Sequence, residues 1–257
     1  MSGPERYLFP AEGPEEQPVR EALTLLTRLC KKTPGTNAIL LTHTRHQLQG
    51  TSLSGCLGEA VCKSLLAGRS VSLPGGGGLL FATERISHRP RPGDILLVIY
   101  ADKKLLDKAD SETQAGAIIV VPWITSEVAD WIATWTPQIG NDLAPARPER
   151  LIDNLVVEKA LTVLTRSINL GNNLAQSSDR DPTVQLLRML KLHGETFDPA
   201  KLRAWAVRNG WSPRGADRLQ EIAQDILDGK RLRVGQEHWR ADLIERLRAE
   251  VQADEGS

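Results

Sequence analysis

The feature that most constrains the fold is a pair of short, almost entirely apolar runs, DILLVIY at residues 94–100 and GAIIVVPW at residues 116–123. Neither run alternates apolar with polar residues, as a strand with one solvent-exposed face would. Such continuous apolar strands are typical of parallel sheets that helices cover on both faces. The intervening segment DKKLLDKADSETQ is long enough for a crossover helix, with Asp102 as its N-cap. The sequence therefore predicts a βαβ unit here.

Further segments on either side extend this pattern of alternating strands and helices. The elements that apolar spacing predicts are a helix carrying Val19, Leu23, Leu26 and Cys30, a short strand in NAILLTH, a helix over residues 54–67, two strand pieces in VSLPGGGGLLFAT, and a helix carrying Val128, Trp131, Ile132 and Trp135. Strands that alternate with helices indicate the α/β class. We predict a small, mainly parallel, three-layer, Rossmann-like domain over residues 17–140, preceded by a disordered tail over residues 1–16.

The second half of the chain has a different character. Residues 141–149, NDLAPARPE, are rich in proline and lack apolar periodicity, so we interpret them as a linker. Residues 150–251 show only helical patterns and predict an all-α domain, with a disordered tail at 252–257. Three of its helices are predicted to begin at Asp181-Pro182, Asp198-Pro199 and Ser212-Pro213, because a capping side chain followed by proline favours a first turn, and to end near Gly194, Gly210 and Gly229.

Composition narrows the functional classes. Lysine plus arginine equals aspartate plus glutamate, at 32 each, so a basic surface for nucleic acid has to be local. No segment approaches the roughly 20 uninterrupted apolar residues of a membrane span. The three cysteines are an odd number and form no CxxC pair, which favours reduced thiols and a cytoplasmic protein. The oligomeric state is not indicated.

The stretch KLRAWAVRNGWSPRGADRLQEIAQDIL, residues 201–227, predicts two helices joined by a tight turn that contains glycine. This is the spacing of a helix-turn-helix, in which the first turns of the second helix contact DNA. Those turns carry Arg214 and Arg218, and the basic stretch that follows adds further candidates for phosphate contact, namely Lys230, Arg231 and Arg233. Residues 201–248 hold eleven basic and seven acidic side chains. An ordinary hairpin that packs within the domain or binds a protein partner is the alternative.

A second group of candidates follows the predicted strands of the first domain. In open parallel sheets, ligands bind outside the carboxyl ends of the strands. The segments expected there supply polar or aromatic side chains suited to a small anionic ligand, namely His43, Arg45, His46, Asp102 and Trp123. The alternative is a surface loop rich in hydrogen-bonding groups, with Asp102 serving only as a helix cap.

Established catalytic motifs are incomplete. The GGGG run at 75–78 lacks the lysine and hydroxyl residue of a phosphate-binding P-loop and precedes a strand, so a flexible hairpin turn is predicted. His43 and His46 have no acidic or cysteine partner nearby in sequence, so no metal site is predicted, and no cofactor is indicated. Two hypotheses remain. The first and leading one is a non-enzymatic, nucleic-acid-associated or regulatory protein. Its helical domain contacts DNA or a protein partner, and its α/β domain serves as a scaffold or senses a small anionic ligand. The second is an enzyme that acts on a nucleotide or phosphorylated substrate at the sheet edge.

Overall fold

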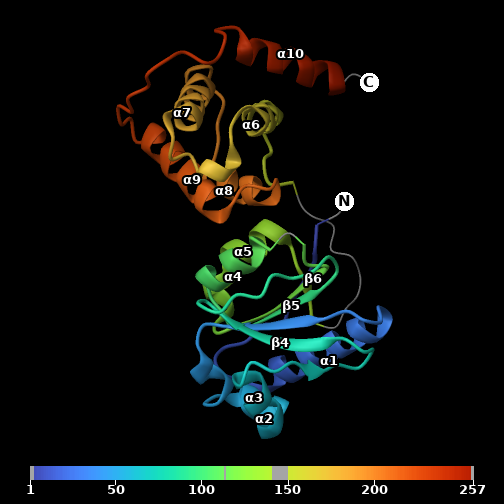
Figure 1. The fold of residues 1–257 in the computed structure, drawn as a ribbon. Helices are drawn as coiled ribbons and strands as arrows, with labels where there is room; N and C mark the ends of the chain where they lie inside the picture. The colour runs from blue at the N-terminus through green and yellow to red at the C-terminus, as the bar shows by residue number, and fades with distance from the viewer. Residues whose placement is uncertain (1–2, 113, 141–149, 256–257) are drawn as a thin grey trace. The chain divides into compact units, whose positions relative to one another are not determined.

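The computed structural model describes residues 3–112, 114–140 and 150–255, and the chain divides into two compact units, Met1–Pro148 and Glu149–Ser257. The first unit contains a mostly parallel sheet with helices, and the second is helical, as Figure 1 shows. The α/β class of the first part and the helical class of the second are therefore as predicted. The segment 141–149, interpreted as a linker, lies outside the described residues.

The sheet of the first unit has seven strands in the order β3-β4-β2-β5-β6-β1-β7. Every pairing is parallel except that of β3 with β4 at one edge. The apolar runs at 94–100 and 116–123 form the neighbouring strands β5 and β6, both buried along their whole length. The strands are β1 Glu5–Leu8, β2 Ala38–Thr42, β3 Val71–Ser72, β4 Gly78–Thr83, β5 Ile95–Ala101, β6 Ala117–Pro122 and β7 Gln138–Ile139.

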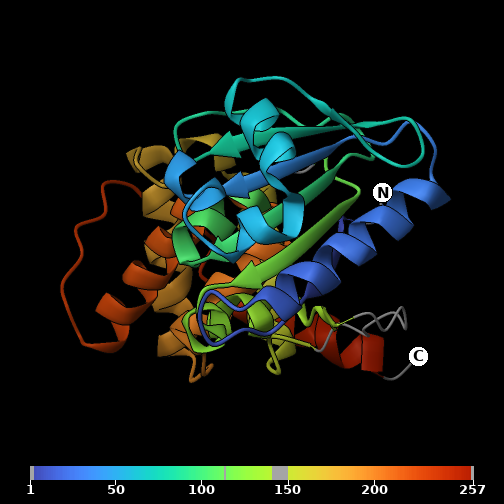
Figure 2. The ribbon, with the colours of Figure 1, turned by 90° about the horizontal axis from the view of Figure 1, so that it is seen from below.

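Each face of the sheet is covered by its own set of helices. Helices α1 (Glu16–Lys32), α2 (Ser52–Leu57) and α3 (Glu59–Leu66) pack on one face, and Figure 2 shows α1 running along it. Helices α4 (Lys103–Asp110) and α5 (Ala129–Trp135) pack on the other. Leu97 of β5 belongs to the first apolar cluster and its neighbour Leu96 to the second. Burial on both faces explains why β5 shows no polar alternation.

Local capping chemistry agrees with the predicted crossover helix. The Asp102 carboxylate accepts a hydrogen bond of 2.9 Å from the Leu105 amide and so caps α4. By contrast, the single helix predicted over 54–67 is two helices, because Gly58 adopts φ +85° and breaks the ladder. The expectation of a disordered tail over residues 1–16 is wrong, since Glu5–Leu8 form β1, which pairs with both β6 and β7.

The β3–β4 hairpin is present, but its glycines serve close packing. A Cβ atom on Gly77 would lie 1.7 Å from the Thr36 carbonyl oxygen, and one on Gly75 would lie 2.4 Å from that of Cys30. The Gly35 amide also donates to the Gly75 carbonyl at 2.9 Å. The interpretation of GGGG as a flexible turn is therefore corrected, because the turn is held against the segment that precedes β2.

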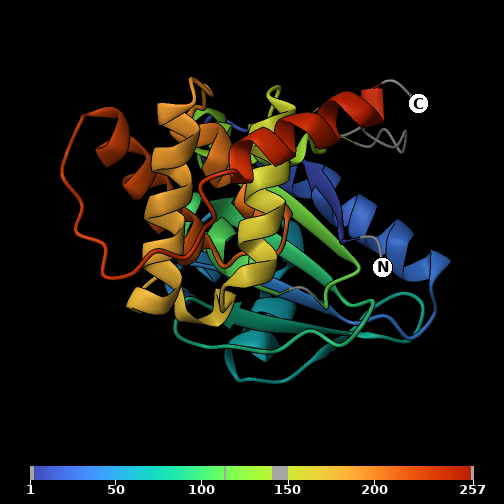
Figure 3. The same ribbon diagram turned by 90° about the horizontal axis from the view of Figure 1, so that it is seen from above.

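The second unit consists of helices and connecting segments, and Figure 3 shows α10 crossing α6 within it. Its apolar core includes Leu161, Leu187, Leu219 and Ile244, all fully buried. Helix α10 continues into the segment 252–257 that was expected to be a disordered tail. The helices are α6 Leu155–Ser167, α7 Ser177–Leu192, α8 Pro199–Arg208, α9 Pro213–Leu227 and α10 Leu243–Glu255.

Two of the three predicted proline starts in this unit are correct. Asp198 caps α8 by accepting from the Ala200 amide, and Ser212 caps α9 by accepting from the Gly215 amide. The third is wrong, because α7 begins at Ser177 and Pro182 lies inside it. The buried Asp181 carboxylate instead accepts hydrogen bonds from the Gly235 amide at 2.8 Å and from the Arg180 guanidinium at 3.1 Å. That contact fastens the extended segment after α9 to α7.

The end of α4 is joined to β1 by a buried ion pair. Arg6 on β1 lies 3.2 Å from the Asp110 carboxylate, and both side chains are less than a tenth exposed. Asp110 also accepts a hydrogen bond of 2.9 Å from the Trp135 indole, and the Arg6 guanidinium stacks on the Trp135 ring. Burial raises the pKa of the Asp110 carboxyl, and the charge of Arg6 opposes that shift. The pair thus secures the short strand β1 to the rest of the sheet.

We predict that Asp110→Ala destabilises the first unit by about 3 kcal/mol, because it leaves the buried Arg6 guanidinium without its counter-charge. Hydrogen exchange of the β5 and β6 amides in the full chain measures the change locally. The control is Asp130→Ala, which removes an exposed carboxylate from the first turn of α5 and is expected to cost at most about 0.5 kcal/mol. Equal effects of the two substitutions would contradict the role given to Asp110.

Candidate functional site

The carboxyl ends of β2 and β5 form the point at which the chain changes direction across the sheet. These strands are neighbours and parallel. After β2 the chain enters α2 and α3 on one face, whereas after β5 it enters α4 on the opposite face. In open α/β sheets such a point leaves a crevice outside the strand ends, where ligands bind. The residues directly after β2, β4 and β5 are therefore the first place to look for a site.

His43, the residue directly after β2, lies between two carboxylates at this point. Its Nδ1 is 2.6 Å from Glu84 Oε1, and its Nε2 is 3.3 Å from Asp102 Oδ1. Glu84 follows β4 and Asp102 follows β5, the two neighbours of β2. The His43 side chain is 20% exposed, and those of Glu84 and Asp102 are 26% and 42% exposed. The cluster formed by His43, Glu84 and Asp102 is thus partly buried but accessible to a dissolved ligand.

Lysine side chains hold Glu84 in place. The Lys104 ammonium lies 2.5 Å from Glu84 Oε2, and the Lys108 ammonium donates to the backbone carbonyls of Thr83 and Glu84. The hydrogen bond from Lys104, and then that from His43, lower the pKa of the Glu84 carboxyl below its ordinary value of 4.5. Glu84 therefore stays ionised at neutral pH. An ionised carboxylate at Nδ1 orients a histidine ring and fixes which nitrogen carries the proton.

A backbone irregularity at the end of β5 shapes the approach to Asp102. Tyr100 adopts a φ of +57°, a value that residues other than glycine rarely adopt. It is the extra residue of a bulge between Ile99 and Ala101. The bulge puts Tyr100 on the same face as Ile99, where its hydroxyl lies 2.7 Å from the Ser52 hydroxyl and accepts from the Leu53 amide at 3.2 Å. Strained residues of this kind concentrate at functional sites. Ala101 and Asp102 are turned toward α4 as a result.

The other residues predicted for this edge lie apart from the cluster. Arg45 is exposed and donates to the Leu66 carbonyl at the end of α3, and His46 is exposed on the same 3₁₀ turn, Arg45–Leu48. Trp123 packs edge-on against the Tyr100 ring, with 5.3 Å between centroids. Of the five predicted ligand residues, the structure therefore brings together His43 and Asp102. Within the described residues, no cluster of histidine, cysteine and acidic side chains has the geometry to hold a metal ion.

In the helical unit, the residues proposed to contact nucleic acid are distributed over two segments. Arg214 is exposed in the first turn of α9, after a connection of four residues, 209–212, from α8. Arg218 forms an ion pair of 2.6 Å with Glu221 one turn later, and Lys230 forms one of 2.6 Å with Asp225. Arg231 and Arg233 are exposed in the segment that follows.

Gly215 does not offer an open backbone to a ligand. It is buried, and a Cβ atom there would lie 3.5 Å from the Asn173 Cα and 3.2 Å from the Ser212 hydroxyl. The backbone that approaches this glycine therefore belongs to the chain itself, at Asn173. The Asp217 carboxylate, 39% exposed, lies 2.6 Å from the guanidinium of the buried Arg203 on α8.

Comparison with known proteins gave a family match within the second unit. Residues 153–248 match the family described as a domain of unknown function (DUF1889). Neither the curated proteins nor the solved structures returned a match. Among the helices of the described residues, none combines the length and apolar character needed to span a bilayer.

The lowered pKa of Glu84 leads to a prediction about the site. Because the ionised form is favoured in the folded state, its ion pairs contribute stability above the ordinary pKa of 4.5, and this contribution is lost as the pH falls through the lowered value. A ¹³C NMR titration of the Glu84 carboxyl should give a midpoint below 4.5, and Lys104→Ala should move it back toward 4.5. Lys103→Ala is the control, since Lys103 pairs with Asp107, and an equal shift in that variant would count against the geometry.

Proposed function

We propose that the first unit is an enzyme that acts on a nucleotide or another phosphorylated small molecule at the carboxyl edge of its sheet. The observation that supports this best is the His43 imidazole held between Glu84 and Asp102 where β2 and β5 diverge. A Rossmann-like arrangement, with helices on both faces and the ligand at the switch point, leads to the same location. A carboxyl group whose pKa is shifted, here Glu84, beside a histidine at such an edge is a recognised sign of a functional site.

The chemistry follows from the roles of the two ring nitrogens. Glu84 accepts a hydrogen bond from Nδ1 and holds the ring in place, so that Nε2 is the nitrogen that exchanges a proton with a bound group. A substrate hydroxyl or water beside Nε2 and Asp102 gives its proton to Nε2 as its oxygen attacks the phosphorus atom of the bound phosphoryl group. A new P–O bond forms, the P–O bond to the leaving oxygen breaks, and Nε2 returns the proton to that oxygen. A positioned acid–base group of this type contributes roughly 10²–10⁴-fold to the rate.

Cationic groups around the edge favour an anionic substrate. Lys103 and Lys104 form the first turn of α4, which follows β5, whereas Arg45 is directed away from the cluster. The ion pair with Glu84 holds the Lys104 ammonium group beside His43, where a phosphate group meets it. Phosphate binding is therefore assigned to Lys104, and proton transfer to His43.

The first test uses ADP as the probe and follows the backbone amides by NMR. Saturable shifts are expected at residues 42–48 and 100–104, and His43→Ala should weaken binding at least about tenfold, the loss of about 1.4 kcal/mol. If a panel of nucleotides and sugar phosphates reveals turnover, His43→Ala should lower it by roughly 10²–10⁴-fold. The matched control is His46→Ala, an exposed histidine on the same turn, which should stay within about twofold of wild type. Unperturbed amides at this edge, or equal effects of the two substitutions, would contradict the proposal.

A second candidate function, contact of the helical unit with DNA, is favoured by one specific observation. The turn between α8 and α9 has the length used by DNA-binding hairpins, and the exposed side chains that open α9 are Arg214 and Arg218. The ion pairs of Arg218 and Lys230 reduce the free positive charge of this surface. For that reason the carboxyl-edge site ranks first, and a regulatory role through this hairpin ranks second.

If α9 contacts DNA phosphates, the double substitution Arg214→Ala and Arg218→Ala should weaken binding to a mixed-sequence duplex. The slope of log K against log salt should fall by about 1.8, since each lost phosphate contact removes about 0.9. Fluorescence anisotropy at several salt concentrations measures both quantities. Arg166→Ala combined with Arg246→Ala, which removes exposed arginines from α6 and α10, is the control of equal charge. Absence of salt-dependent retention, together with no effect of the double substitution, would remove this candidate.

A further inference from the structure

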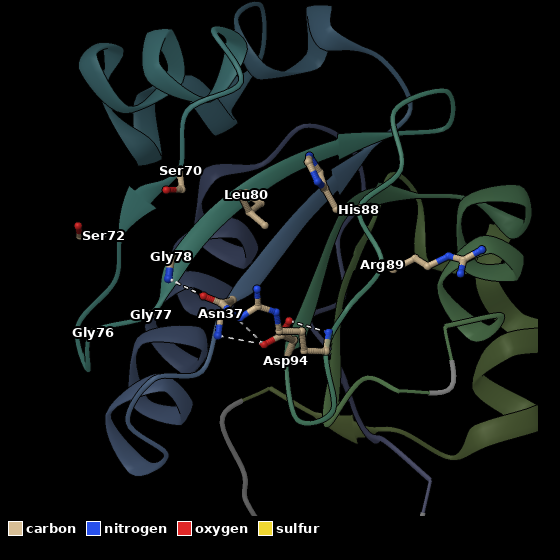
Figure 4. Close-up of a pocket in the computed structure, with 11 residues that line it drawn as sticks. Asn37, Ser70, Ser72, Gly76, Gly77, Gly78, Leu80, His88, Arg89 and Asp94 are labelled. Atoms are coloured by element: carbon tan, nitrogen blue, oxygen red, sulfur yellow. Dashed lines mark hydrogen bonds between the residues drawn. The ribbon is translucent and has the colours of Figure 1, made fainter.

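A pocket of about 430 Å³ lies at the opposite, amino edge of the sheet, where β2, β4 and β5 begin (Figure 4). It is separate from the His43 cluster, which lies at the carboxyl ends of the same strands. Its walls come from β3, the glycine turn before β4, and the segment 84–94 that connects β4 with β5. The volume falls within the range of roughly 300–1,000 Å³ that is usual for small-molecule sites.

Asn37 and Asp94 form a fixed floor. Asp94 is 6% exposed, and its Oδ1 accepts from the Asn37 amide and from the Asn37 side chain, both at 3.2 Å. Its Oδ2 accepts from the Arg91 backbone amide at 2.8 Å, and the side-chain oxygen Oδ1 of Asn37 accepts from the Gly78 backbone amide at 3.0 Å, as the dashed lines in Figure 4 show. The Asp94 carboxylate is thus used in hydrogen bonds within the protein. It is not free to serve as a ligand for a cation.

The charged wall of the pocket is positive. His88, Arg89 and Arg91 are exposed side chains of the connecting segment, and all three line the pocket. Within the part of the chain that the structure describes, no carboxylate lies within ion-pair distance of the guanidinium of Arg89 or Arg91. This distinguishes them from Lys104, which is paired at the carboxyl edge. A guanidinium presents several N–H donors in a plane and matches phosphate oxygens with two bonds at once.

The opposite wall supplies hydroxyl groups on a rigid support. Ser70 and Ser72 line the pocket from the β3 side, and Figure 4 shows them across Asn37 from the segment that carries His88 and Arg89. The adjoining turn is fixed, because the packing of Gly77 against the Thr36 carbonyl leaves no room for a side chain. Hydroxyl and guanidinium groups that line one pocket suit a ligand with several acceptor oxygens.

We propose that this amino-edge pocket binds a small phosphate-bearing anion, with Arg89 and Arg91 supplying the counter-charge and the β3 hydroxyls the neutral donors. The ligand is either inorganic di- or polyphosphate or the phosphate group of a nucleotide, since both present the same oxygens. The site is independent of the activity proposed for His43. Its residues take no part in the cluster at the other edge, so either proposal can fail without the other.

The test is an NMR titration of the full chain with pyrophosphate, and in parallel with ADP, at constant ionic strength. Saturable shifts are expected at the amides of residues 70–78 and 88–94. The double substitution Arg89→Ala and Arg91→Ala should weaken binding at least tenfold. Arg85→Ala is the matched control, because Arg85 is an exposed arginine of the same segment outside the pocket, and it should change the dissociation constant less than twofold.

His43→Ala should leave this binding unchanged, which separates the pocket from the carboxyl-edge site. Tighter binding of ADP would support a nucleotide as the source of the phosphate, and tighter binding of pyrophosphate would support an inorganic ligand. Shifts that do not saturate, or that are reproduced by sodium chloride, would overturn the proposal. So would a loss of affinity in Arg85→Ala equal to that in the double variant.

Discussion

The structure of the first unit depends on the burial of β5 and β6 on both faces. Apolar side chains on both sides of a strand can leave water only if helices cover both faces of the sheet. The helices after β2 and β5 therefore pack on opposite faces, although the two strands are neighbours. Their ends are left uncovered at one edge, and this places His43 and Asp102 side by side. The position of the candidate site is thus a consequence of how the core is packed.

Short-range sequence patterns were sufficient to predict the elements whose signal lies within a few residues. Continuous apolar runs located β5 and β6, and the cap at Asp102 located the start of α4. Strand β1 was missed because ERYL is only four residues long and follows no periodicity, while its partner β6 lies more than a hundred residues away. The helix start predicted at Pro182 was wrong for the opposite reason. Its local signal favours a helix start, yet α7 already begins at Ser177.

The residues of the candidate site also divide into those that the sequence predicts and those that it does not. His43 and Asp102 could be predicted because each follows a recognisable strand and parallel strands end at one edge. Glu84 was missed because its role depends on β4 pairing with β2, which no short-range pattern reports. A search for acidic residues directly after every predicted strand would have found it. Arg45 and His46 show the limit of proximity in sequence, since the 3₁₀ turn after His43 directs them away from the cluster.

The connection from β4 to β5 contains no helix, although it joins two parallel strands. One end of it carries Glu84, anchored by Lys108, and the other carries the arginines and Asp94 of the amino-edge pocket. The same connecting segment therefore supplies residues to both candidate sites, so a change in its length would displace groups at the two opposite edges of the sheet at once.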